Sequence, residues 1–436
     1  MTFFMAAIFM ILVFWRPQEW LAPWLQEVPL LDIVVFAALL GLILELGQKR
    51  ARLPKGPVPY LIAGLWFASM MSHVAHAYFQ GLMDTIPETG KVCFFTLLLL
   101  VVIDRSSRAR AVAAIFVGAA CLMAIHALLQ DLTGTGFAHA EPIYTADAKT
   151  GAPIVRTLFF GIFSDPNDLA QLLATSMPLA FAIPKRMNVF SFLTSTGVVA
   201  LLMMAFLTTH SRGGQIALIA VCVTLVLLRL PARWLPYAML LVLGGAMVVV
   251  ALKGGAMLDE SAQQRVEFWG LANRAFLHNP VFGIGFGMFG QVADDRAAHN
   301  AFVHCYTELG IFGYWFWFGL IALGVTGCWR SRVALMGLRN PDQVCLRRFA
   351  GLSLAAMVGF TTSAYFLSRA WVYPLFFLMA LLNAVPSMVE ELLPQKAHAL
   401  INMRGDLAWV CTVGALLSIV YIYVTILLLN HALYGG

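Results

Sequence analysis

Residues 188–230 read NVFSFLTSTGVVALLMMAFLTTHSRGGQIALIAVCVTLVLLRL, and this stretch decides the fold class. It consists of two apolar runs, 188–209 and 213–230, separated only by a short polar turn. A helix needs about 20 apolar residues to cross the hydrocarbon core of a bilayer. Two such runs joined by so short a turn predict a pair of antiparallel transmembrane helices.

The same pattern extends over the rest of the 436-residue chain, of which 61% is hydrophobic and only 11% charged. A soluble domain is roughly 25% charged, so this chain has too little charge to solvate a globule of its size. Seven cysteines, an odd number placed mostly in apolar runs, argue against a disulfide-stabilised secreted scaffold. We predict an all-α polytopic membrane protein, a single integral domain over 1–436. It has twelve or thirteen spans because the first is short; the candidates are 2–15, 29–46, 58–80, 88–103, 110–130, 166–184, 188–209, 213–230, 233–252, 300–327, 346–368, 370–388 and 406–430.

The distribution of Lys and Arg predicts the orientation. With the N-terminus inside, six loops and the adjacent Arg110 hold 18 of the 28 basic residues, as the positive-inside rule requires; the loops are 47–57, 104–109, 185–187, 229–233, 328–348 and 389–405. These loops also account for the net charge of +6, so the sequence gives no reason to expect a nucleic-acid partner. Ten cations are left for the outer side: Arg16, Lys91, Lys149, Arg156, Arg212, Lys253, Arg265, Arg274, Arg296 and Arg369.

Two of the predicted outer loops, 131–165 and 253–299, are much longer than ordinary connections, and long loops in compact domains are often functional. Within the second loop, residues 261–278 combine apolar and charged side chains in the pattern of an amphipathic helix that lies near the membrane surface. No internal repeat of the kind found in secondary transporters is visible.

The clearest chemical pattern begins at the end of that loop: His299-Asn300, nine residues, then Gly310 and Gly313. A histidine at the mouth of a span can accept a proton near neutral pH. Glycines one turn apart let another segment or a ligand approach the helix backbone. The plainer interpretation is a loop histidine that precedes an ordinary helix.

Two further patterns hold cations on the same predicted side. Arg265-X3-Trp269 places an arginine and a large apolar ring on one helix face, so that Trp269 anchors the helix while Arg265 points into a site. In Ser211-Arg212-Gly213, a guanidinium and the exposed N–H groups at a helix start can both bind an anion. The plainer interpretations are a surface helix with a snorkelling arginine and an interfacial anchor.

Weaker candidates complete the set. Arg156 and Arg369 lie at outer helix ends and would add to a cationic site. The carboxylates Asp165 and Asp168 beside Pro166 fit a helix N-terminus, with a substrate contact as the alternative. His304 and Glu308 face the same way, as a local helix pair or as an oriented imidazole. The chain has no His-Glu-X-X-His motif and no paired cysteines, so we expect neither a metal site nor another cofactor.

Taken together, His299-Asn300-X9-Gly310-X2-Gly313, Arg265-X3-Trp269 and Ser211-Arg212-Gly213 resemble the motifs of the O-antigen ligase and O-antigen polymerase superfamily. The resemblance covers about residues 205–325 and departs from the ligase pattern at Trp269, where the motif often has leucine. It implies a GT-C-like, metal-independent, inverting glycosyltransferase of the bacterial inner membrane, with its site in the large periplasmic loop.

The resemblance further implies a glycan on undecaprenyl diphosphate as donor and a sugar hydroxyl of lipid A–core as acceptor. His299, Arg265 and Arg212 would then be catalytic. Substrate contacts would come from Asn300, Gly310, Gly313, Trp269, Ser211, Gly213, Arg156 and Arg369. A polymerase of O-antigen or exopolysaccharide and a protein O-oligosaccharyltransferase share this donor and stay open as alternatives. A transporter of lipid-linked sugars is the alternative from another class, but it should carry charges at mid-membrane rather than at one face.

Overall fold

The computed structural model describes residues 1–51, 53–54, 56–146, 151–230, 234, 237, 260–393 and 400–434. It is 75% helical, which confirms the predicted all-α class. The α-helices are α1 (Thr2–Met10), α2 (Pro17–Trp20), α3 (Leu30–Gly47), α4 (Val58–Val74), α5 (Phe79–Val102), α6 (Ser106–Thr133), α7 (Pro166–Ala180), α8 (Val189–Thr208), α9 (Arg212–Leu227), α11 (Glu260–His278), α12 (Ala301–Ala334), α13 (Pro341–Ala364), α14 (Tyr373–Leu392), α15 (Met403–Asp406) and α16 (Gly414–Tyr434). Two π-helical segments, Ile11–Trp15 and Leu407–Val413, continue α1 and precede α16. Single 3₁₀ turns lie at Pro23–Leu25, Phe137–His139, Gly161–Phe163 and Phe289–Gln291.

Within the described residues, eight helical segments are long and apolar enough to cross a bilayer, which makes the chain a multi-pass membrane protein: Leu30–Gly47, Phe79–Val102, Ser106–Thr133, Val189–Thr208, Ala301–Ala334, Pro341–Ala364, Tyr373–Leu392 and Met403–Leu433. Three other predicted spans are shorter apolar helices, Thr2–Trp15, Val58–Val74 and Arg212–Leu227. The predicted span 166–184 is instead α7, which ends after 15 residues at Ala180 and is buried along almost its whole length. The predicted span 233–252 lies outside the described residues.

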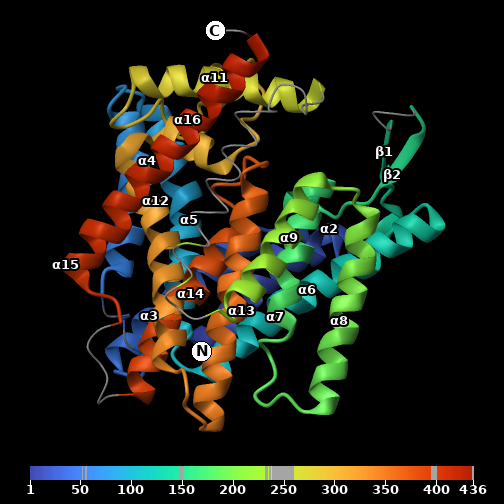
Figure 1. Cartoon of the computed structure of the whole chain (residues 1–436), viewed down its shortest axis with the longest axis vertical. Coiled ribbons are helices and arrows are strands. Elements are labelled where there is room, and N and C mark those ends of the chain that lie inside the picture. Colours follow the sequence, from blue (N-terminus) through green and yellow to red (C-terminus); the bar gives the residue numbers. More distant parts are fainter. Residues whose placement is uncertain are drawn as a thin grey trace.

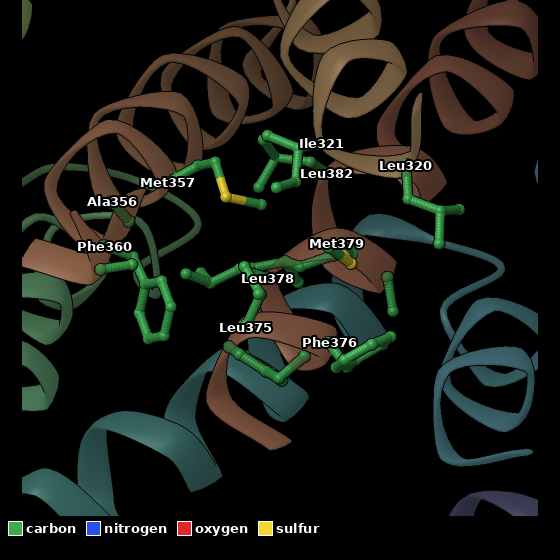
Figure 2. Packing of buried hydrophobic residues seen from close by; sticks show 14 of the residues in the cluster. Leu320, Ile321, Ala356, Met357, Phe360, Leu375, Phe376, Leu378, Met379 and Leu382 are labelled. Carbon is green, nitrogen blue, oxygen red and sulfur yellow. The ribbon is translucent and has the colours of Figure 1, made fainter. Parts of the chain in front are cut away.

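The centre of the bundle is α14, which packs against α5, α12 and α13. Figure 2 shows its Leu375, Phe376 and Leu378 among side chains of α12 and α13. Lipid is as apolar as these side chains, so membrane helices associate through close packing and interhelical hydrogen bonds. Both occur here: Asn383 Nδ2 of α14 donates to Leu320 O of α12 at 2.9 Å, and Gly359 of α13 allows Val221 of α9 to approach closely.

The periphery of the bundle is apolar and exposed. α3, α8 and the segment Met403–Leu433 are the least buried of the long helices. Their outward side chains include Phe36, Phe190 and Leu417, each largely exposed. Such a surface agrees with the predicted contact with membrane lipids.

α11 covers one end of the bundle, and it lies crosswise over the long helices in Figure 1. Its bounds, Glu260–His278, agree with the amphipathic helix predicted at 261–278. The turns before α9, α12 and α14 meet beneath it, all of them predicted to lie on the outer side. We refer to this end as the α11 end.

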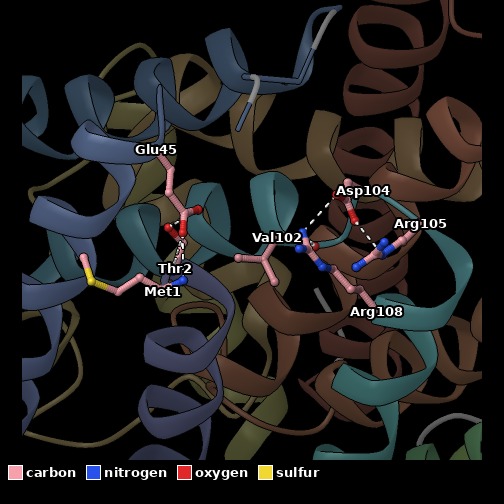
Figure 3. A network of polar contacts seen from close by, with 7 residues as sticks. All are labelled: Met1, Thr2, Glu45, Val102, Asp104, Arg105 and Arg108. Atoms are coloured by element: carbon pink, nitrogen blue, oxygen red, sulfur yellow. Dashed lines mark hydrogen bonds and ion pairs between the residues drawn. The ribbon is translucent and has the colours of Figure 1, made fainter. Parts of the chain in front are cut away.

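Two features near the bundle ends show how local polar contacts set the helices. At the opposite end, Glu45 accepts hydrogen bonds from the backbone and the hydroxyl of Thr2, at 3.1 and 2.6 Å, and joins α3 to α1 (Figure 3). Nearby, Asp104 pairs with Arg108 at 2.9 Å at the start of α6.

In the loop 131–165, β1 (Ile143–Ala146) and β2 (Pro153–Arg156) form an antiparallel hairpin that the sequence analysis did not predict.

Candidate functional site

His299 lies at the α11 end, held by contacts on both of its neighbours. Trp269 of α11 donates its Nε1–H to Ala298 O at 2.6 Å, and the His299 backbone N–H donates to Ser368 Oγ at 2.6 Å. The Asn300 side chain caps α12 by accepting the N–H groups of Phe302 and Val303. With φ of 48°, His299 adopts a left-handed conformation that is uncommon for a residue with a Cβ, and these contacts fix it.

A cavity of about 500 Å³ opens beside this histidine. α11 contributes Gln264, Arg265 and Phe268 to its wall, and the segment before α12 contributes Arg296, Ala297 and His299. The Arg296 guanidinium lies over the Phe268 ring, 5.5 Å from its centroid. Among the residues that the structure describes, the wall carries two arginines and a histidine and no carboxylate, a composition that favours an anionic ligand. We call it the cationic cavity.

A polar network joins the β1–β2 hairpin and the start of α7 to the turn before α9. Ser211 caps α9 by accepting the Gly214 N–H, and its hydroxyl donates to Asn167 Oδ1 at 2.8 Å. Arg156 from β2 donates to the same oxygen at 3.1 Å and to Thr209 O at 2.9 Å. The hairpin, the start of α7 and the α8–α9 turn are thus joined through one amide.

Three arginines from separate segments interact electrostatically: the charges of Arg212 and Arg265 both act on Arg156. Burial lowers the pKa of Arg156, and the positive charges of Arg212 and Arg265 lower it further, while Asp165 opposes them. Like charges are unfavourable at such range unless an anion compensates them. The structure therefore gathers three predicted cations into one positive region.

His299 lies in the same electrostatic environment. Its pKa is lowered by burial, and the charges of Arg265 and Arg369 lower it further, against the opposite effect of Asp165. A lowered pKa keeps the imidazole neutral at pH 7, the state in which it can accept a proton.

Arg369 has a strong partner of its own. Its guanidinium forms a bidentate ion pair with Asp168, a residue only 3% exposed in the first turn of α7, with Nε donating to Oδ1 at 2.8 Å. Hydrogen bonding to Asp168 raises the pKa of Arg369. The pair fastens the α13–α14 turn, and with it Ser368, to α7.

The three predicted glycines, Gly310, Gly313 and Gly213, contact other parts of the protein, and none of them lines the cationic cavity. Gly310 breaks α12 with φ of 63° and ψ of −170°, and a Cβ there would come within 2.2 Å of Val281 O. The chain beside it is bonded into the break, with Gly285 N–H donating to Glu308 O at 3.1 Å. Gly313 faces the Leu309 side chain. Gly213, which lies in the first turn of α9, packs near the Phe366 side chain.

Sequence reasoning missed the parts played by three residues. Arg296 stood among the predicted outer cations without a role, and its position three residues before His299 was the available signal. Asp168 was expected at a helix N-terminus, but its pairing with Arg369 and the contact of Ser368 with His299 had no signal, because they join segments 201 and 69 residues apart. No group of three metal-ligating side chains lies within the part of the chain that the structure describes; metal independence stays a prediction.

Residues 197–318 match a family model described as O-Antigen ligase. This match confirms the resemblance to the O-antigen ligase and polymerase superfamily that the motifs indicated. The matched stretch contains Ser211, Arg212, Arg265, Trp269 and the whole His299 motif. No curated protein matches the chain at a significant level. The family match supports a function of the O-antigen ligase or polymerase type, with a lipid-linked glycan and a glycan acceptor as the general substrates.

Proposed function

We propose that this protein is an O-antigen ligase, which transfers a preassembled glycan from undecaprenyl diphosphate to a sugar hydroxyl of lipid A–core at the periplasmic face of the bacterial inner membrane. The observation that carries the proposal is the cationic cavity, which combines Arg265 with a half-buried His299 whose lowered pKa favours the neutral imidazole. Transfer from a diphosphate needs both features: cations for the negative charge of the leaving group, and a base for the proton of the attacking hydroxyl.

The reaction is a single displacement. The acceptor oxygen attacks the anomeric carbon of the donor glycan, and the bond from that carbon to the diphosphate oxygen breaks. The bonding electrons remain on undecaprenyl diphosphate, whose charge Arg265 and Arg212 hold. The hydroxyl proton passes to neutral His299 and then to solvent. The anomeric configuration is inverted because only one displacement occurs.

The remaining residues position these groups. Arg156 adds positive charge and connects the turn that bears Arg212 to α7 through Asn167. Trp269 and Asn300 hold the backbone on either side of His299. No step requires a metal or an organic cofactor, so we expect activity in the presence of a chelator.

An O-antigen or exopolysaccharide polymerase and a protein O-oligosaccharyltransferase would use the same donor site and differ only in acceptor. The family match does not distinguish the acceptors of these enzymes from the acceptor of a ligase. A transporter is less compatible with the geometry, because Arg156, Arg212, Arg265 and His299 gather at the α11 end rather than at mid-membrane.

Glycan transfer by the purified protein in detergent with EDTA tests the proposal. The donor is an undecaprenyl-diphosphate glycan, offered with lipid A–core, with a second lipid-linked glycan, or with an acceptor protein. We expect product with lipid A–core only. We expect His299→Ala and Arg265→Ala each to lower kcat about 10²-fold or more.

The controls come from the same helix. His278→Ala removes a second histidine of this loop that is followed by an asparagine, Asn279, as His299 is followed by Asn300. Arg274→Ala removes an exposed arginine of α11 that does not line the cationic cavity. Both should keep wild-type activity. Product with another acceptor would reassign the subfamily, and full activity of the His299 variant would remove the base.

A further inference from the structure

A second cavity, of about 510 Å³, lies at the same end of the bundle. α5 contributes Asp84 and Glu88 to its wall, α12 contributes His304 and Glu308, and the α13–α14 turn contributes Arg369 and Trp371, besides residues of α4 and of the loop before α12. We call it the acidic cavity. None of the roles proposed above uses it.

The two cavities are neighbours. Ser368 lies in the wall of the acidic cavity, and its Oγ accepts the backbone N–H of His299, which lies in the wall of the cationic cavity. A ligand in the acidic cavity would therefore lie next to the segment that carries the proposed base.

The charges of the two cavities are opposite. Three carboxylates line the acidic cavity, and its arginine, Arg369, is neutralised by Asp168. Glu308 is bound by His304 at 2.9 Å and by the Phe289 N–H at 3.2 Å. In the described part of the chain, Asp84 accepts only from Gln80, and the Glu88 carboxylate has neither a hydrogen bond nor an ion pair. A phosphorylated ligand would be repelled here.

The wall also contains two buried polar atoms that have no partner in the part of the chain that the structure describes. Trp371 Nε1 and His304 Nδ1 are buried and have no hydrogen-bond partner among the described residues. A buried polar group without a partner is unfavourable, and both residues line this cavity, so a ligand bound in it would complete them. The complementary ligand must donate to carboxylates and accept from the Trp371 N–H, and a sugar hydroxyl does both.

We propose that the acidic cavity binds the acceptor glycan, and that it selects a terminal sugar that is neutral or bears an amino group rather than a phosphorylated one. The inference rests on the proposed transferase function and adds the chemical class of the acceptor. The phosphate groups of the donor go to the cationic cavity, and the hydroxyls of the acceptor go to the acidic cavity.

Binding of delipidated core oligosaccharide to the purified full chain, measured by saturation-transfer difference NMR in EDTA, tests the inference. The probe is used as isolated and after chemical removal of its phosphates. Wild type should prefer the dephosphorylated probe. Glu88→Lys should shift the ratio of the two affinities toward the phosphorylated probe by about tenfold or more, because it reverses one charge. Trp371→Phe should weaken both probes.

Glu141→Lys, at an exposed position outside both cavities, is the matched control and should leave the ratio unchanged. Undecaprenyl-diphosphate binding, measured in parallel, should be unaltered by Glu88→Lys. An unchanged ratio in Glu88→Lys, wild-type preference for the phosphorylated probe, or no binding of either probe would overturn the inference. If the ratio shifts but wild type transfers no glycan, the proposed function fails while the sugar site stands.

Discussion

At the residue scale, the proposed chemistry depends on the protonation state of one imidazole, that of His299. Arg265 on α11, Arg369 on the α13–α14 turn and Asp165 at the start of α7 act on His299, and burial with the two arginines outweighs the carboxylate. The lowered pKa favours the neutral form, so a base at His299 is fully available at neutral pH and is lost only as the pH falls through its pKa.

The pH profile of transfer should therefore fall on the acid side below the ordinary histidine pKa of about 6.5. Arg265→Gln removes a positive charge, so the His299 pKa should rise and the acid limb should move to higher pH in the residual activity. Asp165→Asn, which can still cap α7, should move it to lower pH. Profiles of kcat/KM measure this, and shifts of the same sign in both variants would exclude His299 as the titrating base.

Trp269→Phe tests positioning of that imidazole. The ring is retained, but the N–H that bonds Ala298 O is lost, so the backbone before His299 is less well fixed. We expect kcat to fall about tenfold, with a loss of about 1 kcal/mol in unfolding free energy. Kinetics and thermal unfolding separate the two effects. Unchanged kcat with lowered stability would make Trp269 a packing residue only.

Much of the site could be predicted residue by residue, because His299, Arg265 and Arg212 occur in recognisable local patterns. Their partners could not. Arg369 was expected to join a cationic site, yet its guanidinium is committed to Asp168, 201 residues away. Such a pair depends on how α7 packs beside α13, and no local sequence pattern contains that information.

At the element scale, the decisive feature is the break in α12. The chain 280–285 is hydrogen-bonded against residues 307–312, and this contact brings the end of the large loop to the mouth of the helix. The approach is possible only because Gly310 and Gly283 both have positive φ and no Cβ.

Gly310→Ala should destabilise the protein by about 2 kcal/mol or more, because a Cβ would meet Val281 O at 2.2 Å in a left-handed conformation. Thermal unfolding in detergent measures this. Gly197→Ala in α8 is the control: it has open space around it and should be neutral or stabilising by up to about 1 kcal/mol. Equal effects of both changes would contradict the role of the break.

Hydropathy predicted most elements well because spans are long, uniform runs. It wrongly predicted a span at α7. This helix is only 15 residues long, and its apolar residues are buried among other helices rather than facing lipid. It also missed the β1–β2 hairpin, whose four-residue strands are too short to give a periodic signal. The break at Gly310 lies inside a continuous apolar run and is invisible to hydropathy.

At the scale of the whole molecule, the cations of the proposed site and His299 gather at one end of the bundle, and the predicted cytoplasmic loops hold most of the remaining basic residues. From this distribution, the positive-inside rule predicts that the α11 end faces the periplasm. Asp131→Cys at this end should react with a membrane-impermeant maleimide in intact cells, and Lys49→Cys should react only after lysis. The reverse pattern would invert the topology.

The central claim is that the cationic cavity beside His299 holds the diphosphate of the donor. A cryo-electron microscopy structure of the protein with an undecaprenyl-diphosphate glycan tests it most directly. We predict diphosphate density within hydrogen-bond distance, about 3 Å, of Arg265 and Arg212, with the anomeric carbon facing His299. Diphosphate density in the acidic cavity, or at the opposite end of the bundle, would contradict the claim.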